Sequence, residues 1–256
     1  MIHETAVIEP GAELGEGVSI GPYSIIGKDV SIGDGTQIGP HVVIKGPTRI
    51  GRENKIYQFA SLGEDPQDKK YDNEETWLEI GDRNTIREFC TFNRGTIQDK
   101  AVTRIGNENW VMAYVHIAHD CMVGNNTIFA NNASLAGHVA VEDFAILGGF
   151  TLVHQFCRIG AHSFSAMNSV ISKDVPPYVM VSGHMAKPYG LNTEGLKRRG
   201  MSAEAGNQLR RAYKLIYRSG KTLKEAITEL EPERVHYPEI DRMLTFLSHV
   251  TRGIVR

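Results

Sequence analysis

The sequence predicts a mainly β protein, a parallel β-helix followed by a small helical domain, and three observations support this. An aliphatic residue recurs at every sixth position from Ile8 to Leu62, and glycine usually follows it. The pattern breaks at two polar interruptions and then resumes as far as Ile171. In the last quarter of the chain the apolar spacing becomes helical. A period of six fits neither a lone helix nor an alternating strand, and it is typical of hexapeptide β-helices.

The β-helix is expected over residues 1–186. Each hexad forms one short strand and a turn, three hexads close a triangular coil, and the next coil stacks roughly 4.8 Å away. The leading aliphatic residue and the residue four places on point inward, and glycine accepts turn geometry that a side chain disfavours. Cys90, Cys121 and Cys157 all fall at inward positions. Cys121 and Cys157 are two coils apart, too far for a disulfide, so we expect buried, reduced thiols.

Two excursions interrupt the repeat. The first, near residues 64–77, is polar and rich in turn-forming residues. The second, near residues 94–102, shifts the phase of the repeat by one residue. Leaving so regular a solenoid costs stability unless the excursion packs or binds something, so both are candidate functional loops.

The helical domain is expected over residues 187–256. A first helix begins at Ser202 and carries Leu209, Ala212, Tyr213 and Ile216 at helical spacing. Thr222 and Glu225 form a capping box that opens a second helix, and Pro238 opens a third.

Composition excludes several classes of protein. The chain is 41% hydrophobic and 23% charged, with a formal net charge of −2, so no overall basicity indicates a nucleic-acid partner. The N-terminus lacks the basic flank and apolar run of a secretory signal. No stretch approaches the roughly 20 apolar residues that span a bilayer. We therefore expect a cytoplasmic protein without stable membrane insertion.

Four of the ten histidines lie between residues 116 and 154, and stacking brings them together. Residues 18 apart share a column on a regular coil, which gives one column of His119, Gly137 and Gln155 and a second of Asp120, His138 and Phe156. His116 lies just before His119 in the chain, and His154 lies next to Gln155. His41 and His162 are interpreted as ordinary corner residues.

Two interpretations of this cluster remain. Some hexapeptide β-helix proteins resemble carbonic anhydrases with three histidines on a zinc ion. Here Asp120 directly follows His119 and can engage its imidazole, which favours an oriented neutral base over a metal ligand. We rank the metal site second.

The same residues resemble a known family. The segments 116–121, 131–139 and 153–157, together with matches at 56–61, 67–71, 192–200, 212–218 and 251–254, resemble the UDP-N-acetylglucosamine 3-O-acyltransferases. The resemblance covers the whole chain and implies a left-handed coil and a homotrimer. It implies transfer of a (3R)-3-hydroxyacyl group from acyl carrier protein to the 3-hydroxyl of UDP-N-acetylglucosamine, the first step of lipid A biosynthesis, with no metal or other cofactor. The related N-acyltransferase carries an extra domain before its hexads, which begin here at Ile8.

The resemblance also suggests roles for individual residues. His119 is expected as general base, Asp120 as its orienting carboxylate and the Gly137 N–H as oxyanion donor. Contacts to the sugar are expected from Asp68, Lys70, His116 and His138, and His154 and Gln155 are expected to line the same cleft. Contacts to the nucleotide are expected from Asn192, Glu194, Arg198 and Arg199. Met167 matches a wall that measures the acyl chain, and its bulk predicts a preference for about ten carbons.

Other hypotheses stay open. A different hexapeptide enzyme could use acetyl-CoA as the donor for O-acetylation. A structural or ice-binding solenoid is disfavoured, because the coils lack flat arrays of threonine. Basic residues gathered between positions 195 and 224 predict a surface where an acidic acyl carrier protein docks.

Overall fold

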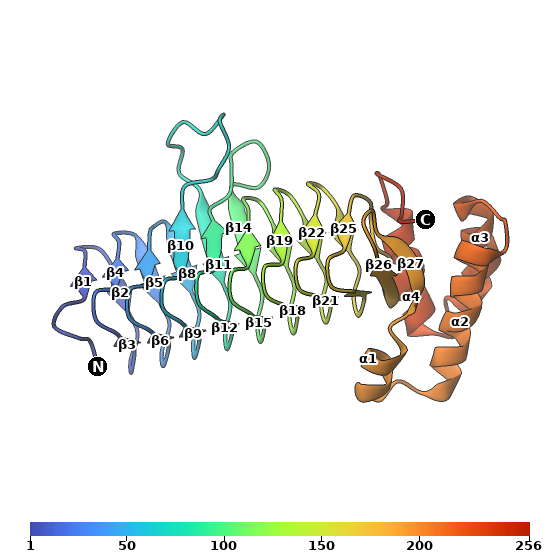
Figure 1. Ribbon diagram of the computed structural model, residues 1–256, viewed down its shortest axis with the longest axis horizontal. Coiled ribbons are helices and arrows are strands. Elements are labelled where there is room, and N and C mark those ends of the chain that lie inside the picture. The colour runs from blue at the N-terminus through green and yellow to red at the C-terminus, as the bar shows by residue number, and fades with distance from the viewer.

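The computed structural model describes all 256 residues and forms a long triangular prism with a helical cap at one end (Figure 1). The three sides of the prism are sheets whose neighbouring strands run parallel, apart from one terminal hairpin. The first sheet contains β1 (Val7–Ile8), β4 (Ile25–Ile26), β7 (Val43–Ile44), β10 (Ser61–Glu64), β13 (Thr91–Asn93), β16 (His116–Ile117), β19 (Ser134–Leu135), β22 (Leu152–Val153) and β25 (Val170–Ile171).

The other two sheets complete each coil. The second contains β2 (Glu13–Leu14), β5 (Val30–Ile32), β8 (Thr48–Ile50), β11 (Trp77–Ile80), β14 (Val102–Ile105), β17 (Met122–Val123), β20 (Ala140–Val141) and β23 (Arg158–Ile159). The third contains β3 (Ser19–Ile20), β6 (Gln37–Ile38), β9 (Lys55–Ile56), β12 (Thr85–Ile86), β15 (Trp110–Val111), β18 (Ile128–Phe129), β21 (Ile146–Leu147), β24 (Phe164–Ser165), β26 (Val179–Ser182) and β27 (Lys187–Leu191). We call the corner from the first to the second sheet edge I, from the second to the third edge II, and from the third back to the first edge III.

The register of the strands confirms the predicted repeat. In uninterrupted coils each residue pairs with the residue 18 places on, as Ile117 does with Leu135. The leading aliphatic residues and the apolar residues four places on form one continuous core inside the prism. Cys90, Cys121 and Cys157 are buried and free, as expected, and burial raises the pKa of the Cys121 thiol to about 12.

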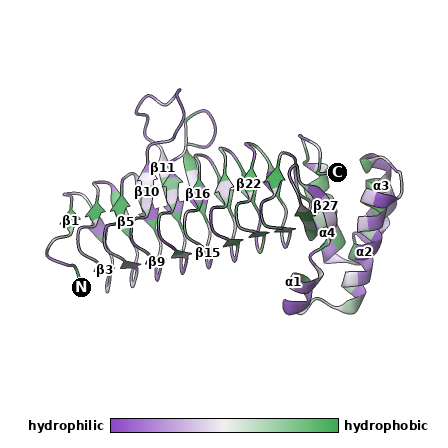
Figure 2. Cartoon of the chain, in the orientation of Figure 1, coloured by the Kyte–Doolittle hydropathy of each residue, from purple (hydrophilic) through white to green (hydrophobic).

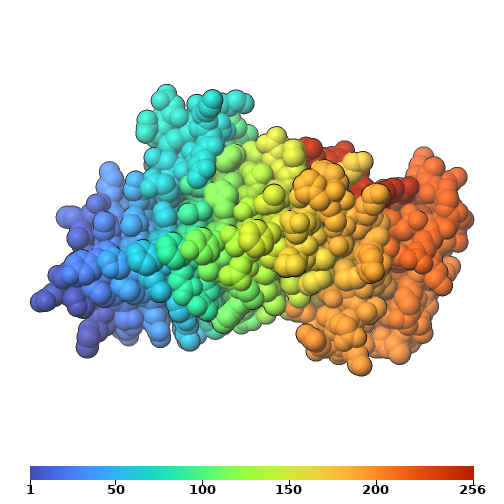
Figure 3. Space-filling model, viewed as in Figure 1, coloured from blue at the N-terminus to red at the C-terminus, as the bar shows by residue number.

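Both excursions leave the prism at edge I. The first lies between β10 and β11 and the second between β13 and β14. Figure 3 shows them as a protrusion above the body of the prism, and Figure 2 colours both mostly as hydrophilic. Because the second excursion inserts residues, Thr91 of β13 pairs with His116, 25 places on.

The helical domain begins later than residue 187. Strand β27 pairs antiparallel with β26, so the hairpin extends the third sheet as far as Leu191. The helices are α1 (Thr193–Arg198), α2 (Ala203–Arg218), α3 (Leu223–Leu230), the short η1 (Glu231–Glu233) and α4 (Pro238–Ser248). Ser202 caps α2, Thr222 and Glu225 form the capping box of α3, and Pro238 opens α4, all as predicted. The sequence analysis missed α1. None of the helices has both the length and the apolar character that crossing a bilayer requires.

Candidate active site

His119 and Asp120 form a hydrogen-bonded pair at edge I, in the turn between β16 and β17. The His119 Nδ1 lies 2.8 Å from the Asp120 Oδ2. The backbone at Asp120 has a φ of 59°, a left-handed turn conformation that folds its side chain back beneath the imidazole. Asp120 is 1% exposed, whereas the His119 ring reaches the surface. The expected contact between neighbours in the sequence is therefore present.

Thr96, from the second excursion, fixes the Asp120 carboxylate. The Thr96 N–H donates to both carboxylate oxygens, at 3.0 and 3.1 Å, and its hydroxyl donates to Oδ2 at 2.6 Å. The Asp120 N–H in turn donates to the Thr103 hydroxyl at 2.8 Å. Burial alone would raise the pKa of Asp120, but the hydrogen bonds from His119 and Thr96 hold this pKa below its usual value. Asp120 is therefore ionised at neutral pH and keeps the proton of His119 on Nδ1.

Gly137 lies directly against the other side of the imidazole. A Cβ atom there would come within 2.6 Å of the His119 Cε1 and 2.7 Å of its Nε2, so no side chain fits while the ring stays in place. The neighbouring N–H groups of Ala136 and His138 donate to Val153 and His119, whereas the Gly137 N–H donates to no protein acceptor. A free backbone donor therefore lies close to the His119 imidazole.

Two further histidines flank this pair. The His138 ring lies edge-on to His119, with centroids 5.0 Å apart, and its Nδ1 lies 3.0 Å from the Asp99 Oδ2 of the second excursion. The His116 Nδ1 lies 2.7 Å from the Thr91 hydroxyl. Burial, with a smaller contribution from His119, lowers the pKa of His116, which keeps this imidazole neutral.

His119, Asp120 and His138 also form the one group of side chains with metal-ligand spacing. Their ligand atoms lie within 4.8 Å of one another. Each histidine Nδ1 engages a carboxylate, and both oxygens of Asp120 accept hydrogen bonds from Thr96, so Asp120 serves as a hydrogen-bond acceptor while the Nε2 of His119 stays unengaged. The arrangement suits proton transfer better than metal binding.

The other residues expected near the sugar lie at the same edge of the prism. Asp68 and Lys70 belong to the first excursion, where the Lys70 N–H donates to the Asp68 carboxylate at 3.0 Å. His154 and Gln155 are exposed one coil beyond Gly137, and the His154 Nδ1 forms a hydrogen bond with the Gln155 carbonyl at 3.1 Å. They share edge I with His119 but do not touch it.

Five expected site residues lie elsewhere on the chain. Asn192, Glu194, Arg198 and Arg199 belong to α1 or flank it, and Figure 1 shows α1 at the C-terminal end of the prism, away from the excursions. The Asn192 side chain caps α1 by accepting from the Gly195 N–H, and its amide donates to the His162 carbonyl. The Arg199 guanidinium lies 4.3 Å from the centre of the Phe144 ring at edge II. Met167 lies at edge III and is 74% exposed. A single chain does not bring these five to His119.

Sequence analysis missed Thr96, Asp99 and Thr103. Their side chains hold the Asp120 and His138 of the site, yet two of them lie in the excursion, where the six-residue repeat assigns no position. The sequence feature that points to Thr96 and Asp99 is the second excursion itself, a candidate functional loop.

Comparison with known proteins gives one consistent family. Residues 174–255 match the family model described as UDP-N-acetylglucosamine O-acyltransferase, domain 2, and residues 29–64 and 103–137 match bacterial transferase hexapeptide repeats. The chain is 66% identical to the acyl-(acyl-carrier-protein)–UDP-N-acetylglucosamine O-acyltransferase of Thiobacillus denitrificans, over 100% of this chain and 99% of that protein. It is 57% identical to the protein of the same name from Herminiimonas arsenicoxydans, with the same coverage.

Solved structures agree. LpxA from Acinetobacter baumannii superposes with a TM-score of 0.97 at 51% identity, covering 100% of this chain and 99% of that one. The UDP-N-acetylglucosamine acyltransferase of Francisella novicida gives a TM-score of 0.98 at 41% identity, covering 100% and 94%. These matches confirm the predicted left-handed β-helix with its helical C-terminal domain.

Proposed function

The chain belongs to the family of acyl-(acyl-carrier-protein)–UDP-N-acetylglucosamine O-acyltransferases, and we propose that His119 is the general base of its reaction. The enzyme transfers an acyl group from acyl carrier protein to UDP-N-acetylglucosamine in lipid A biosynthesis. The observation that supports His119 is its hydrogen bond to the buried Asp120, which leaves Nε2 free beside Gly137.

The proposed chemistry uses these three residues in sequence. The His119 Nε2 takes the proton of the sugar 3-hydroxyl as its oxygen bonds to the thioester carbon. Asp120 stabilises the imidazolium that forms, and the Gly137 N–H donates to the tetrahedral oxyanion. Collapse breaks the carbon–sulfur bond, and the imidazolium returns the proton to the departing thiolate. The products are the 3-O-acyl sugar and the carrier thiol, and the balance requires no further reactant.

The direct test is an acyl-transfer assay with UDP-N-acetylglucosamine and 3-hydroxyacyl carrier proteins of graded length, with acetyl-CoA as the competing donor. We expect activity with the carrier thioesters, a preference for about ten carbons, and none with acetyl-CoA. Met167→Gly should shift the optimum to longer chains, because each buried methylene contributes about 0.8 kcal/mol, and four of them more than a hundredfold in selectivity. A wild-type preference for fourteen carbons would show that Met167 does not limit the chain.

We further propose that the enzyme is a homotrimer with its active sites between subunits. Met167 and the residues of α1 lie too far from the His119 of their own chain, at other edges or at the far end of the prism. Edge III also exposes apolar side chains, including Tyr114 and Phe150, that another copy would cover. Light scattering should give the mass of three chains, and a monomer at micromolar concentration would rule the proposal out.

The acyl carrier protein is proposed to dock on the helical domain. Arg210, Arg211, Lys214 and Arg218 of α2 line an open depression of about 530 Å³. A basic surface of this kind speeds encounter with an acidic partner. Arg210→Glu with Arg211→Glu should raise the KM for the carrier substrate several-fold and flatten its salt dependence. An unchanged KM at low salt would exclude this surface as the docking site.

A further inference from the structure

One short segment of the chain contacts three parts of the candidate site. It begins in β13, where Thr91 bonds His116, and continues to Asn93, whose amide donates to the Asp65 carbonyl at 2.7 Å. It ends at Thr96, which holds the carboxylate of Asp120. Arg94 lies between these contacts, and its guanidinium points the other way, toward the first excursion.

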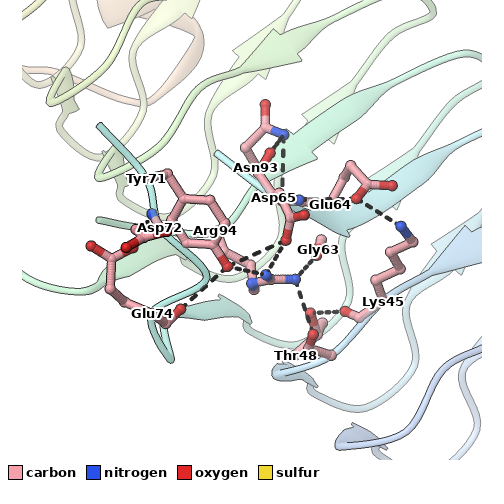
Figure 4. A network of polar contacts seen from close by, with 11 residues as sticks. Lys45, Thr48, Gly63, Glu64, Asp65, Tyr71, Asp72, Glu74, Asn93 and Arg94 are labelled. Atoms are coloured by element: carbon pink, nitrogen blue, oxygen red, sulfur yellow. Dashed lines mark hydrogen bonds and ion pairs between the residues drawn. The ribbon is translucent and has the colours of Figure 1, made fainter. Parts of the chain in front are cut away.

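The Arg94 guanidinium is buried and binds four groups at the base of that excursion (Figure 4). One nitrogen donates to the Gly46 carbonyl at 2.9 Å and the Gly63 carbonyl at 2.7 Å. The other donates to the Tyr71 hydroxyl at 2.9 Å and forms an ion pair with the Asp65 carboxylate. The first two acceptors belong to the prism and the last two to the excursion.

We call the Arg94 guanidinium and the four groups that it binds the Arg94 clamp. The part of this clamp that belongs to the prism is rigid. Gly63 has a φ of +76°, and a Cβ atom there would collide with the Lys45 carbonyl and the Thr48 hydroxyl. The two acceptors from the excursion, Asp65 and Tyr71, lie in the sequence on either side of Asp68 and Lys70, the proposed sugar contacts. Tyr71 also reaches the Glu74 carbonyl at 3.3 Å. A planar guanidinium that bonds all four groups fixes both ends of the segment 65–71 relative to the coil.

We propose that Arg94 is a positioning residue that holds the first excursion, and with it Asp68 and Lys70, over the His119 site. This inference rests on the proposed role of Asp68 and Lys70 as sugar contacts. Arg94 acts only on binding of the UDP-sugar, whereas Thr96, two residues further on, acts on the proton transfer through Asp120. Two residues of one short segment thus control substrate binding and base chemistry separately.

The experiment compares Arg94→Lys and Arg94→Met with Arg83→Met in the full-length enzyme. Arg83 is a matched control, because it forms an exposed ion pair with Glu108 at edge II. We expect the Arg94 variants to raise the KM for UDP-N-acetylglucosamine about tenfold, or about 1.4 kcal/mol, with kcat and its pH profile unchanged. Lysine keeps the positive charge but lacks the planar set of N–H donors of a guanidinium. Arg94→Lys should therefore fold and still show the higher KM.

Limited trypsin digestion gives a readout independent of catalysis. Lys69 and Lys70 are exposed, and release of the clamp should make cleavage there faster in the Arg94 variants but not in Arg83→Met. Unchanged cleavage and an unchanged KM would overturn the proposal. A fall in kcat with a constant KM would overturn it too, because it would show a general structural defect.

Two further variants test the role of Arg94 separately from the assignment of Asp68 and Lys70 as sugar contacts, on which it rests. If Asp68→Asn and Lys70→Met raise the KM and the Arg94 variants do not, Arg94 is not the clamp. If Asp68→Asn and Lys70→Met leave the KM unchanged, the sugar-contact assignment fails, and the positioning role for Arg94 fails with it even where the loop is cleaved faster.

Discussion

Edges I and II of the prism both carry a histidine in a stack of aromatic rings. At edge I, His138 stacks on Phe156 with ring centroids 4.4 Å apart. At edge II, His162 lies between Phe144, at 4.8 Å, and Tyr178, at 5.4 Å. Both histidines occupy the same corner position, with φ values of 63° and 58°. The backbone and the ring stacking are therefore alike at the two edges.

The polar neighbours differ. At edge I the Nδ1 atoms of His119 and His138 each meet a carboxylate, Asp120 and Asp99. At edge II the Nδ1 of His162 is buried without a hydrogen-bond partner. Burial, together with two nearby arginines, lowers the pKa of His162 to about 4. The repeat thus supplies a corner that admits an aromatic ring at either edge. At edge I the turn adds Asp120, and the second excursion adds Asp99 and the Thr96 that fixes Asp120, so these histidines gain carboxylate partners.

The largest effect that tests this comparison is expected for His119→Ala. Loss of a general base lowers kcat roughly 10²- to 10⁴-fold, and the fold should survive because the ring lies at a corner and not in the core. His162→Phe is the matched variant at edge II and should keep its turnover. Acyl-transfer kinetics on both proteins decide the point. The assignment is wrong if the alanine variant keeps more than about a tenth of the wild-type rate.

Asp120→Asn should have the second largest effect. The variant keeps the size of the side chain but loses the charge that orients His119 and stabilises its imidazolium, so kcat should fall about a hundredfold. Asp143→Asn is the control, because Asp143 accepts the Asn125 N–H at edge II, remote from the chemistry. An equal fall of kcat in Asp120→Asn and Asp143→Asn would show that carboxylates at edge I are no more important for turnover than those at edge II.

The regular part of the site could be predicted and the irregular part could not. Stacking at intervals of 18 residues placed Gly137 beside His119, and adjacency in the sequence placed Asp120 against its ring. The second excursion shifts the phase, so no spacing rule could show that Thr96 reaches Asp120 or that Arg94 reaches Asp65. Interpretation of Asn192 as a nucleotide contact rested on resemblance, whereas its side chain here caps α1, a role that asparagine favours.

The smallest expected effect concerns stability at edge II. The pKa of His162 lies at about 4 in the folded protein, whereas a histidine exposed to water has a pKa of 6.5, so between these values the unfolded chain binds more protons. Stability is therefore fully present above pH 6.5 and is lost as the pH falls toward 4. His162→Phe should fit the corner, because Phe144 and Phe150 adopt the same positive φ, and it should remove about 1 kcal/mol of this pH dependence after allowance for solvent screening. Chemical denaturation of both proteins at pH 7 and pH 5 measures the difference. Identical pH dependence in the two would mean that His162 is hydrated and can charge freely, and that burial does not distinguish edge II from edge I.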